Sequence, residues 1–166
     1  MLKSASVLAA AVLAAAGLAG AAQAASISPA GASFSLVGPL QLSQSTTVVC
    51  DVTLSGSVDP SGGFATITGG AFAPGDWQCG WLVVPSSFPW TVTPTGGGAS
   101  GTELRIDGIG ANSILGNCAG TVFVDWQNAP PSPSGATFVN ATIPGSPGTC
   151  YITGRLDSYP DLTVTP

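Results

Sequence analysis

The sequence contains no histidine, and its one lysine, Lys3, lies at the very start of the chain. Without histidine, Ser-His-Asp and Cys-His catalysis are excluded, and the most common metal-ligating side chain is missing. Without lysine beyond residue 3, Ser-Lys and Schiff-base mechanisms are excluded as well. We therefore predict that the protein is not an enzyme, and we expect no catalytic, cofactor-binding or metal site.

Charged residues are scarce, at 7% of the sequence against about 25% in typical globular proteins. Beyond Lys3, only Arg105 and Arg155 oppose eight acidic residues, which gives a net charge of −6. Nucleic acids and anionic membranes are bound through basic surfaces, so neither is an expected partner. A surface of uncharged polar residues has little repulsion from neutral surfaces or from other copies of itself. The expected partners are therefore a hydrophobic interface, a neutral surface or, by self-association, the same chain.

Residues 1–24 have the pattern of a signal peptide. Lys3 supplies the basic start, residues 7–18 form an Ala/Leu-rich apolar run, and Ala22-Gln23-Ala24 supplies the small residues that precede cleavage. An uncleaved anchor would need about 20 apolar residues with firm flanks. We predict cleavage after Ala24, a single exported domain at residues 25–166, and no transmembrane segment after cleavage. The protein is expected to be secreted or to stay at the cell surface.

The exported part reads as short strands separated by Gly/Pro turns. Residues 48–58, 120–126, 136–143 and 150–156 are rich in β-branched and aromatic side chains, and turn clusters occupy 59–63, 73–76, 94–98, 128–135 and 144–148. No segment after residue 24 sustains a helical period. The pattern predicts an all-β fold, an antiparallel sandwich or barrel.

Two stretches of the sequence, 71 residues apart, resemble each other: ATITGGAFAPGDWQC at 65–79 and ATFVNATIPGSPGTC at 136–150. A Ser-aromatic-Pro triplet follows each of them at the same distance, at 87–89 and 158–160. This echo indicates two pseudo-repeated β-units at about 50–94 and 118–165, although a Thr/Ala-rich composition could also produce it by chance.

Four cysteines in an exported protein predict two disulfides. A zinc site would instead show cysteines paired two to four residues apart, whereas the spacings here are 29, 39 and 32 residues. Spacing alone leaves three connectivities open. If each repeat closes its own bridge, the pairs are Cys50–Cys79 and Cys118–Cys150.

Three of the four tryptophans, Trp77, Trp81 and Trp90, lie within 14 residues, and Trp126 stands alone. We expect Trp81 and Trp126 to pack in the core, since a tryptophan against a disulfide commonly fills a sandwich. Trp77 follows a Pro-Gly-Asp turn and is expected to be exposed. Trp77 and Trp90 are the candidate surface-binding residues, because an exposed tryptophan can stack on sugars or enter an oil interface.

The acidic residues suggest structural roles. Glu103, Arg105 and Asp107 alternate and would share one face of a strand. We interpret them as a solvated face, since a glycosidase pair faces across a cleft. Asp59 begins the run DPSGG, and we predict a turn there because no calcium-loop pattern is present.

Several stretches are characteristic of one family: the opening SISPAGASFSLVG, then CDVTLSGSV, ATITGGAF, FPWTV, GNC at 116–118, VDWQN and the closing CYITGRLDSYPDLTVTP. In these the chain resembles small exported bacterial proteins described as activators of alkane oxidation, of the PraB type. The likeness spans nearly all of residues 25–166. It implies an exported protein that aids growth on alkanes without being the oxygenase.

We therefore expect a non-enzymatic protein that aids hydrocarbon access by adsorbing at an oil interface or at the cell surface. One alternative is a self-associating subunit of a biofilm matrix or fibre, in which residues 32–42 complete a neighbour's sheet or else form the first strand of their own domain. The other is a carbohydrate-binding module that uses Trp77 or Trp90.

Overall fold

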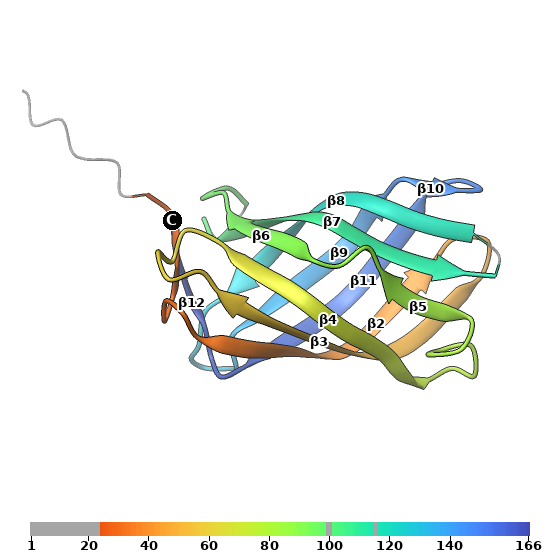
Figure 1. Ribbon diagram of the computed structural model, residues 1–166, viewed down its shortest axis with the longest axis horizontal. Helices are drawn as coiled ribbons and strands as arrows, with labels where there is room; N and C mark the ends of the chain where they lie inside the picture. The colour runs from red at the N-terminus through yellow and green to blue at the C-terminus, as the bar shows by residue number, and fades with distance from the viewer. Residues whose placement is uncertain (1–23, 99–100, 115) are drawn as a thin grey trace, which may run out of the picture.

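The computed structural model describes residues 24–98, 101–114 and 116–166 (Figure 1). The predicted signal peptide lies outside the described residues except for Ala24. The described residues form strands and no helix, so they contain no helix long and apolar enough to cross a membrane. The strands are β1 (Ser26–Ser28), β2 (Ser33–Ser43), β3 (Thr47–Val58), β4 (Ala65–Gly75), β5 (Val83–Ser86), β6 (Trp90–Pro94), β7 (Glu103–Ser113), β8 (Gly116–Gln127), β9 (Gly135–Ile143), β10 (Gly145–Ser146), β11 (Cys150–Tyr159) and β12 (Thr163–Thr165).

Eight of these strands close into an antiparallel barrel in the order β8-β9-β11-β2-β3-β4-β6-β7, and β7 pairs back with β8. The closing ladder is long, from Glu103 opposite Asp125 to Ser113 opposite Gly116. β6 pairs with the first half of β7, and β5 pairs with its second half. β10 pairs with the start of β8. The all-β prediction is confirmed, and the architecture is the barrel and not the sandwich.

Side chains alternate between the barrel interior and the solvent along each long strand. In β3, Val48, Cys50, Val52 and Leu54 are buried, while the residues between them are exposed. This period of two is what a strand with one buried face requires. The apolar residues that the sequence supplies at alternate positions thus become the wall of one continuous interior.

Glycines allow two neighbouring strands to come close where the barrel curves. A Cβ on Gly38 of β2 would lie 2.3 Å from the carbonyl oxygen of Arg155, and one on Gly154 of β11 would lie 2.5 Å from that of Pro39. Gly154 also has φ +142° and follows a shift in the pairing of β11 with β9. Glycines in strand interiors are expected at such bends.

The two ends of the barrel differ in what covers them (Figure 1). We call the end that carries the loops after β3, β6, β8 and β11 the closed end, because the β1–β12 ribbon lies there. The opposite end, which carries the loops after β2, β4, β7 and β10, we call the open end. In Figure 1 the closed end is on the left, beside β12, and the open end is on the right, beside β5 and β10.

Both disulfides lie toward the open end. Cys50 bonds to Cys79 and Cys118 bonds to Cys150, with Cα–Cα distances of 5.6 and 6.1 Å. The two disulfides and the pairing predicted from the repeat are confirmed. Each ties the first strand of an antiparallel hairpin, β3–β4 or β8–β9, to the segment that follows it.

The predicted repeat does not continue evenly after the second cysteine of each half. Cys150 begins the ten-residue strand β11, whereas Cys79 lies in a loop before the four-residue strand β5. The repeat itself stays a prediction. The turn predicted at 73–76 was placed too early, because β4 runs on to Gly75 through a register shift opposite Cys50.

Candidate functional site

The half of the barrel interior next to the closed end is filled by large side chains. Leu104, Ile106, Val122, Val124 and Trp126 project inward from β7 and β8 and are all buried. Trp126 retains 3% of its exposure, which confirms its predicted place in the core. This half is packed as an ordinary hydrophobic core.

Hydrogen bonds fix a lid over the closed end. Asn128 Oδ1 accepts from Trp126 Nε1 at 3.0 Å and from the Val164 amide at 2.8 Å, and its Nδ2 donates to the Val164 carbonyl. The buried Ser134 Oγ accepts from the Leu162 amide at 2.8 Å. These bonds hold the apolar side chains of Leu162 and Val164 against the end of the core.

The other half of the interior is hollow. A cavity of about 300 Å³ opens between the loops of the open end, at the lower end of the usual range for ligand pockets. Its deep wall consists of Leu54, Phe72, Trp90, Phe138 and Leu156. At its mouth lie Gln44, Ser45, Thr46, Gln78, Asn112 and Tyr151. None of the described residues that line this cavity is charged.

The cavity exists because the same strands carry smaller residues toward the open end. β7 supplies Leu104 and Ile106 to the packed half, whereas beyond Ile109 it supplies only Ala111 and Ser113 to the inner wall of the cavity. β8 likewise changes from Trp126 to Gly116 and Cys118. An eight-stranded barrel is just wide enough for side chains to fill it or for one small ligand to occupy it, so side-chain size decides which occurs.

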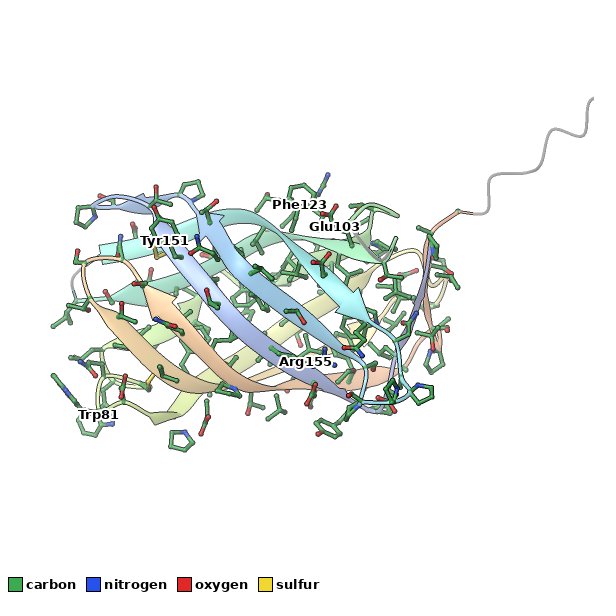
Figure 2. All side chains as sticks on the ribbon, turned by 180° about the vertical axis from the view of Figure 1, so that it is seen from behind. Trp81, Glu103, Phe123, Tyr151 and Arg155 are labelled. Atoms are coloured by element: carbon green, nitrogen blue, oxygen red, sulfur yellow. A yellow bond between two sulfur atoms is a disulfide. The ribbon has the colours of Figure 1, made fainter. Side chains whose placement is uncertain are left out.

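Among the described residues of the open end, three large hydrophobic side chains are more than 70% exposed: Trp77 at 77%, Trp81 at 88% and Ile114 at 73%. We call them the open rim. Figure 2 shows Trp81 beyond the open end of the strands, pointing away from the barrel. Trp77 and Ile114 also line the mouth of the cavity, whereas Trp81 does not.

The loop that carries the two tryptophans is anchored at its start. Asp76 Oδ2 accepts from the Val49 amide at 2.8 Å, and the Asp76 amide donates to the Val49 carbonyl at 2.9 Å. The Cys79 disulfide follows three residues later. The exposure of Trp77 and Trp81 is therefore a property of a fixed loop and not of a free end.

Two of the expectations for tryptophans were wrong. Trp81 was expected in the core but is the most exposed of the four, because Gly80, with φ +77°, begins a tight turn that leads outward to β5. Trp90 was a candidate for surface binding but retains only 1% of its exposure. It stacks on Phe88 at 4.5 Å, and its Nε1 donates to the Ser86 carbonyl at 2.8 Å. The predicted exposure of Trp77 is confirmed, and its binding role stays a prediction.

The charged residues on β7 form a solvated outer face, as expected. Arg105 pairs with Asp107 at 2.6 Å, and Glu103 Oε2 accepts from the Thr95 hydroxyl at 2.9 Å. The Thr121 hydroxyl, and then Arg105, hold the pKa of Asp107 below its ordinary value. These residues do not line the cavity.

Asp59 makes the predicted turn. Its Oδ1 accepts from the Ser61 amide and hydroxyl, and its carbonyl accepts from the Gly62 amide at 2.8 Å. The hydrogen bonds from Ser61 lower the pKa of the Asp59 carboxyl. Within residues 24–98, 101–114 and 116–166, no cluster of three or more His, Cys, Asp or Glu is placed to hold a metal ion.

The described residues thus define a disulfide-stapled β-barrel that is closed at one end and hollow and apolar at the other. The profile of the family described as alkane oxidation protein activator, PraA/PraB-like, matches residues 1–166. The chain therefore belongs to this family, which confirms the resemblance seen in the sequence. No curated protein and no solved structure matches the chain.

Proposed function

We propose that the protein is a non-enzymatic helper of alkane oxidation that adsorbs to hydrocarbon surfaces through its open rim, either after secretion or at the cell surface. The observation that carries the proposal is the gathering of Trp77, Trp81 and Ile114, all largely exposed, at one end of the barrel. The family name supports a role in alkane oxidation.

The rim has enough apolar area to bind an oil surface. A tryptophan side chain presents roughly 150–250 Å². At about 25 cal/mol per Å², full transfer of one such side chain into oil is worth about 4–6 kcal/mol. The carboxylate in the same loop, Asp76, accepts a hydrogen bond from the Val49 amide. It therefore keeps this hydrogen bond when the rim meets the oil.

A non-enzymatic role is supported by the side chains themselves. The chain has no histidine, and Lys3 is its one lysine. The carboxylates of Glu103 and Asp107 lie on an outer face, and each accepts a hydrogen bond from a threonine hydroxyl. General acid–base catalysis needs a titratable group aimed at a bound substrate, and none of the described residues that line the cavity is an aspartate, glutamate, lysine or arginine.

Interfacial tension tests the proposal directly. The oxidised, exported protein is expected to lower the hexadecane–water tension far beyond a charge-matched soluble β-protein. Trp81→Ala should need about tenfold more protein for the same fall, since loss of part of one tryptophan's transfer energy exceeds the 1.4 kcal/mol that a factor of ten requires. Trp81 is the cleanest position because it does not line the cavity.

Tyr159→Ala is the matched control, because Tyr159 is also an exposed aromatic residue, at 54%, but lies at the closed end. It should behave as the unaltered protein. If the protein lowers the tension no more than the unrelated β-protein, or if both variants lose activity equally, adsorption through the open rim is wrong.

The alternatives predict other results. A fibre subunit should give filaments in the electron microscope that vanish when residues 25–36 are deleted; in the structure, however, β2 pairs with β3 and β11 of its own chain. A carbohydrate-binding module should show tryptophan quenching by a polysaccharide that Trp77→Ala abolishes.

A further inference from the structure

We propose that the cavity in the open half of the barrel is a binding site for one uncharged, unbranched alkyl chain, such as an n-alkane or the n-alkanol formed from it. The cavity itself argues for an apolar chain. The proposal rests on the proposed function only for the choice of a hydrocarbon among apolar ligands.

The lining selects against charge. The deep wall consists of aliphatic and aromatic side chains, and the polar lining residues are serines, glutamines, one threonine and one asparagine, all uncharged, with the Tyr151 phenol. The two arginines, which would pair with an anionic head group, do not line the cavity. An ionised carboxylate would have to lose its water without a cationic partner, which is costly. The ligand is therefore neutral.

The depth of the cavity suits an extended chain. Val48 near the mouth and Leu54 at the deep wall are both on β3 and both line the cavity. The strand between them spans about 20 Å, which becomes about 15 Å along the barrel axis for a strand tilt of about 40°. With carbon–carbon bonds near 1.5 Å and near-tetrahedral angles, each methylene adds about 1.3 Å, so about twelve carbons fit.

One polar atom near the mouth lacks a partner. Gln78 lines the cavity, and its Oε1 is buried without a hydrogen-bond partner among the described residues. An amide oxygen only accepts hydrogen bonds. The hydroxyl of an alkanol could donate to it, whereas an alkane or a carboxylate could not. A buried acceptor left unpaired is unfavourable, so an alkanol should bind more tightly than the alkane of equal length.

The cavity and the open rim are continuous. Trp77 and Ile114 belong to both, since they line the mouth and are largely exposed. The mouth would therefore face the oil when the rim adsorbs, and a chain could enter without crossing water. The structure thus joins an adsorbing surface to an internal site for a single molecule.

Ligand loading tests the site. The oxidised, exported protein is incubated with n-decane, n-dodecane or the corresponding 1-alkanols, freed of unbound ligand by gel filtration, extracted and analysed by gas chromatography. We expect one molecule per chain. In titrations with 1-alkanols followed by tryptophan emission, the affinity should rise about tenfold for every two methylenes, and stop rising near twelve carbons. Sodium dodecanoate at pH 8 should bind far more weakly than 1-dodecanol.

Two neighbouring valines provide matched variants. Val48 is buried and lines the cavity, whereas Val49 is exposed on the outside of β3. Val48→Phe is expected to lower loading at least tenfold, and Val49→Phe to leave it within twofold. Thermal unfolding checks that both variants fold. Ala111→Leu, which fills the cavity from β7, gives the same test if Val48→Phe does not fold.

Separate variants distinguish failure of this inference from failure of the proposed function. Trp81→Ala should weaken adsorption to hexadecane but leave ligand loading unchanged. Val48→Phe should lower ligand loading but leave adsorption to hexadecane unchanged. Gln78→Met should remove the preference for alkanol over the alkane of equal length. Equal loading of Val48→Phe and Val49→Phe, several ligands per chain, or an affinity that keeps rising with chain length would overturn the internal site.

Discussion

The closed and open ends of this barrel are made by the same strands and held in different ways. At the closed end, Trp126 and its neighbours fill the interior, and Asn128 and Ser134 fix a lid over it. At the open end the interior is hollow, and its rim exposes tryptophans. Side-chain packing is concentrated in one half, which leaves the other half free to present apolar surface.

The disulfides compensate for the missing packing. Both lie toward the open end and close loops of 29 and 32 residues. In the chain-entropy account each is worth roughly 3–4 kcal/mol. Covalent ties of this kind are common in small exported proteins whose cores are limited. They tie β3 and β8, beside the cavity, to later segments of the chain in the half of the barrel that side chains do not fill.

The largest expected effect comes from making one substitution at both ends. Trp126→Ala removes a buried aromatic from the packed half and should lower the free energy of unfolding by about 3–5 kcal/mol. Trp81→Ala removes an exposed tryptophan from the open rim and should change it by less than about 0.5 kcal/mol. Urea unfolding of both variants, with disulfides intact, measures the difference.

The slope of the transition with urea provides the control, since it should stay constant if both variants unfold in two states. Equal losses for the two variants would mean that the open rim is packed in solution. The distinction drawn between the two ends would then be wrong.

Much of the fold could be predicted from the sequence because it depends on local signals. Alternation in residues 48–58 gave β3, and the four cysteines with the repeat gave both disulfides. The choice between sandwich and barrel could not be made, because it depends on the pairing of β2 with β11, which come from opposite ends of the described chain. Such non-local pairings leave no mark in a short window.

The site was harder to predict than the fold. Trp81 and Trp90 lie nine residues apart in similar surroundings, yet one is exposed and the other buried. The turn at Gly80 and the pairing of Trp90 with Ile67 decide this, and neither follows from composition. The cavity did leave a trace in the sequence, since most residues between 110 and 120 other than Ile114 and Leu115 are small, but these residues indicate a hollow interior only once it is known which of them point into the barrel.

Adding the same atoms to both halves gives a second, smaller contrast. Ala111 lines the cavity, whereas Ala136 is buried opposite Trp126 in the packed half. Ala111→Leu should raise the free energy of unfolding by about 0.5–2 kcal/mol, because it fills empty space. Ala136→Leu should lower it by about 1–3 kcal/mol, because it overpacks a filled core.

Chemical denaturation of both variants measures these shifts. Circular dichroism in the far ultraviolet should stay unchanged, which excludes a rearranged fold as the cause. If both variants lose a similar amount of unfolding free energy, the open half is already filled and the cavity is absent in solution. If both gain unfolding free energy, the closed half is not fully packed.

The smallest expected effect concerns acid and the closed end. Asp59 begins the turn between β3 and β4, and the amides of Gly31 and Ile27 donate to the carbonyls of Asp59 and Gly62 in this turn. Hydrogen bonds from Ser61 lower the pKa of Asp59 from its ordinary value of 3.8. A lowered pKa in the folded state means that the carboxylate stabilises the fold above pH 3.8 and that this contribution is lost as the pH falls through the folded value.

Asp59→Asn should therefore lower the melting temperature slightly at pH 7, and this difference should shrink as the pH falls below 3.8 and the wild-type carboxyl gains its proton. Ser61→Ala removes the hydroxyl that donates to Asp59, so its melting temperature at pH 7 should lie between those of the wild type and Asp59→Asn. Melting followed by circular dichroism across this pH range measures the difference. A gap between wild type and Asp59→Asn that stays constant from pH 7 to pH 2 would assign the effect to the shape of the turn, because an effect of the Asp59 charge must disappear when the carboxyl gains its proton.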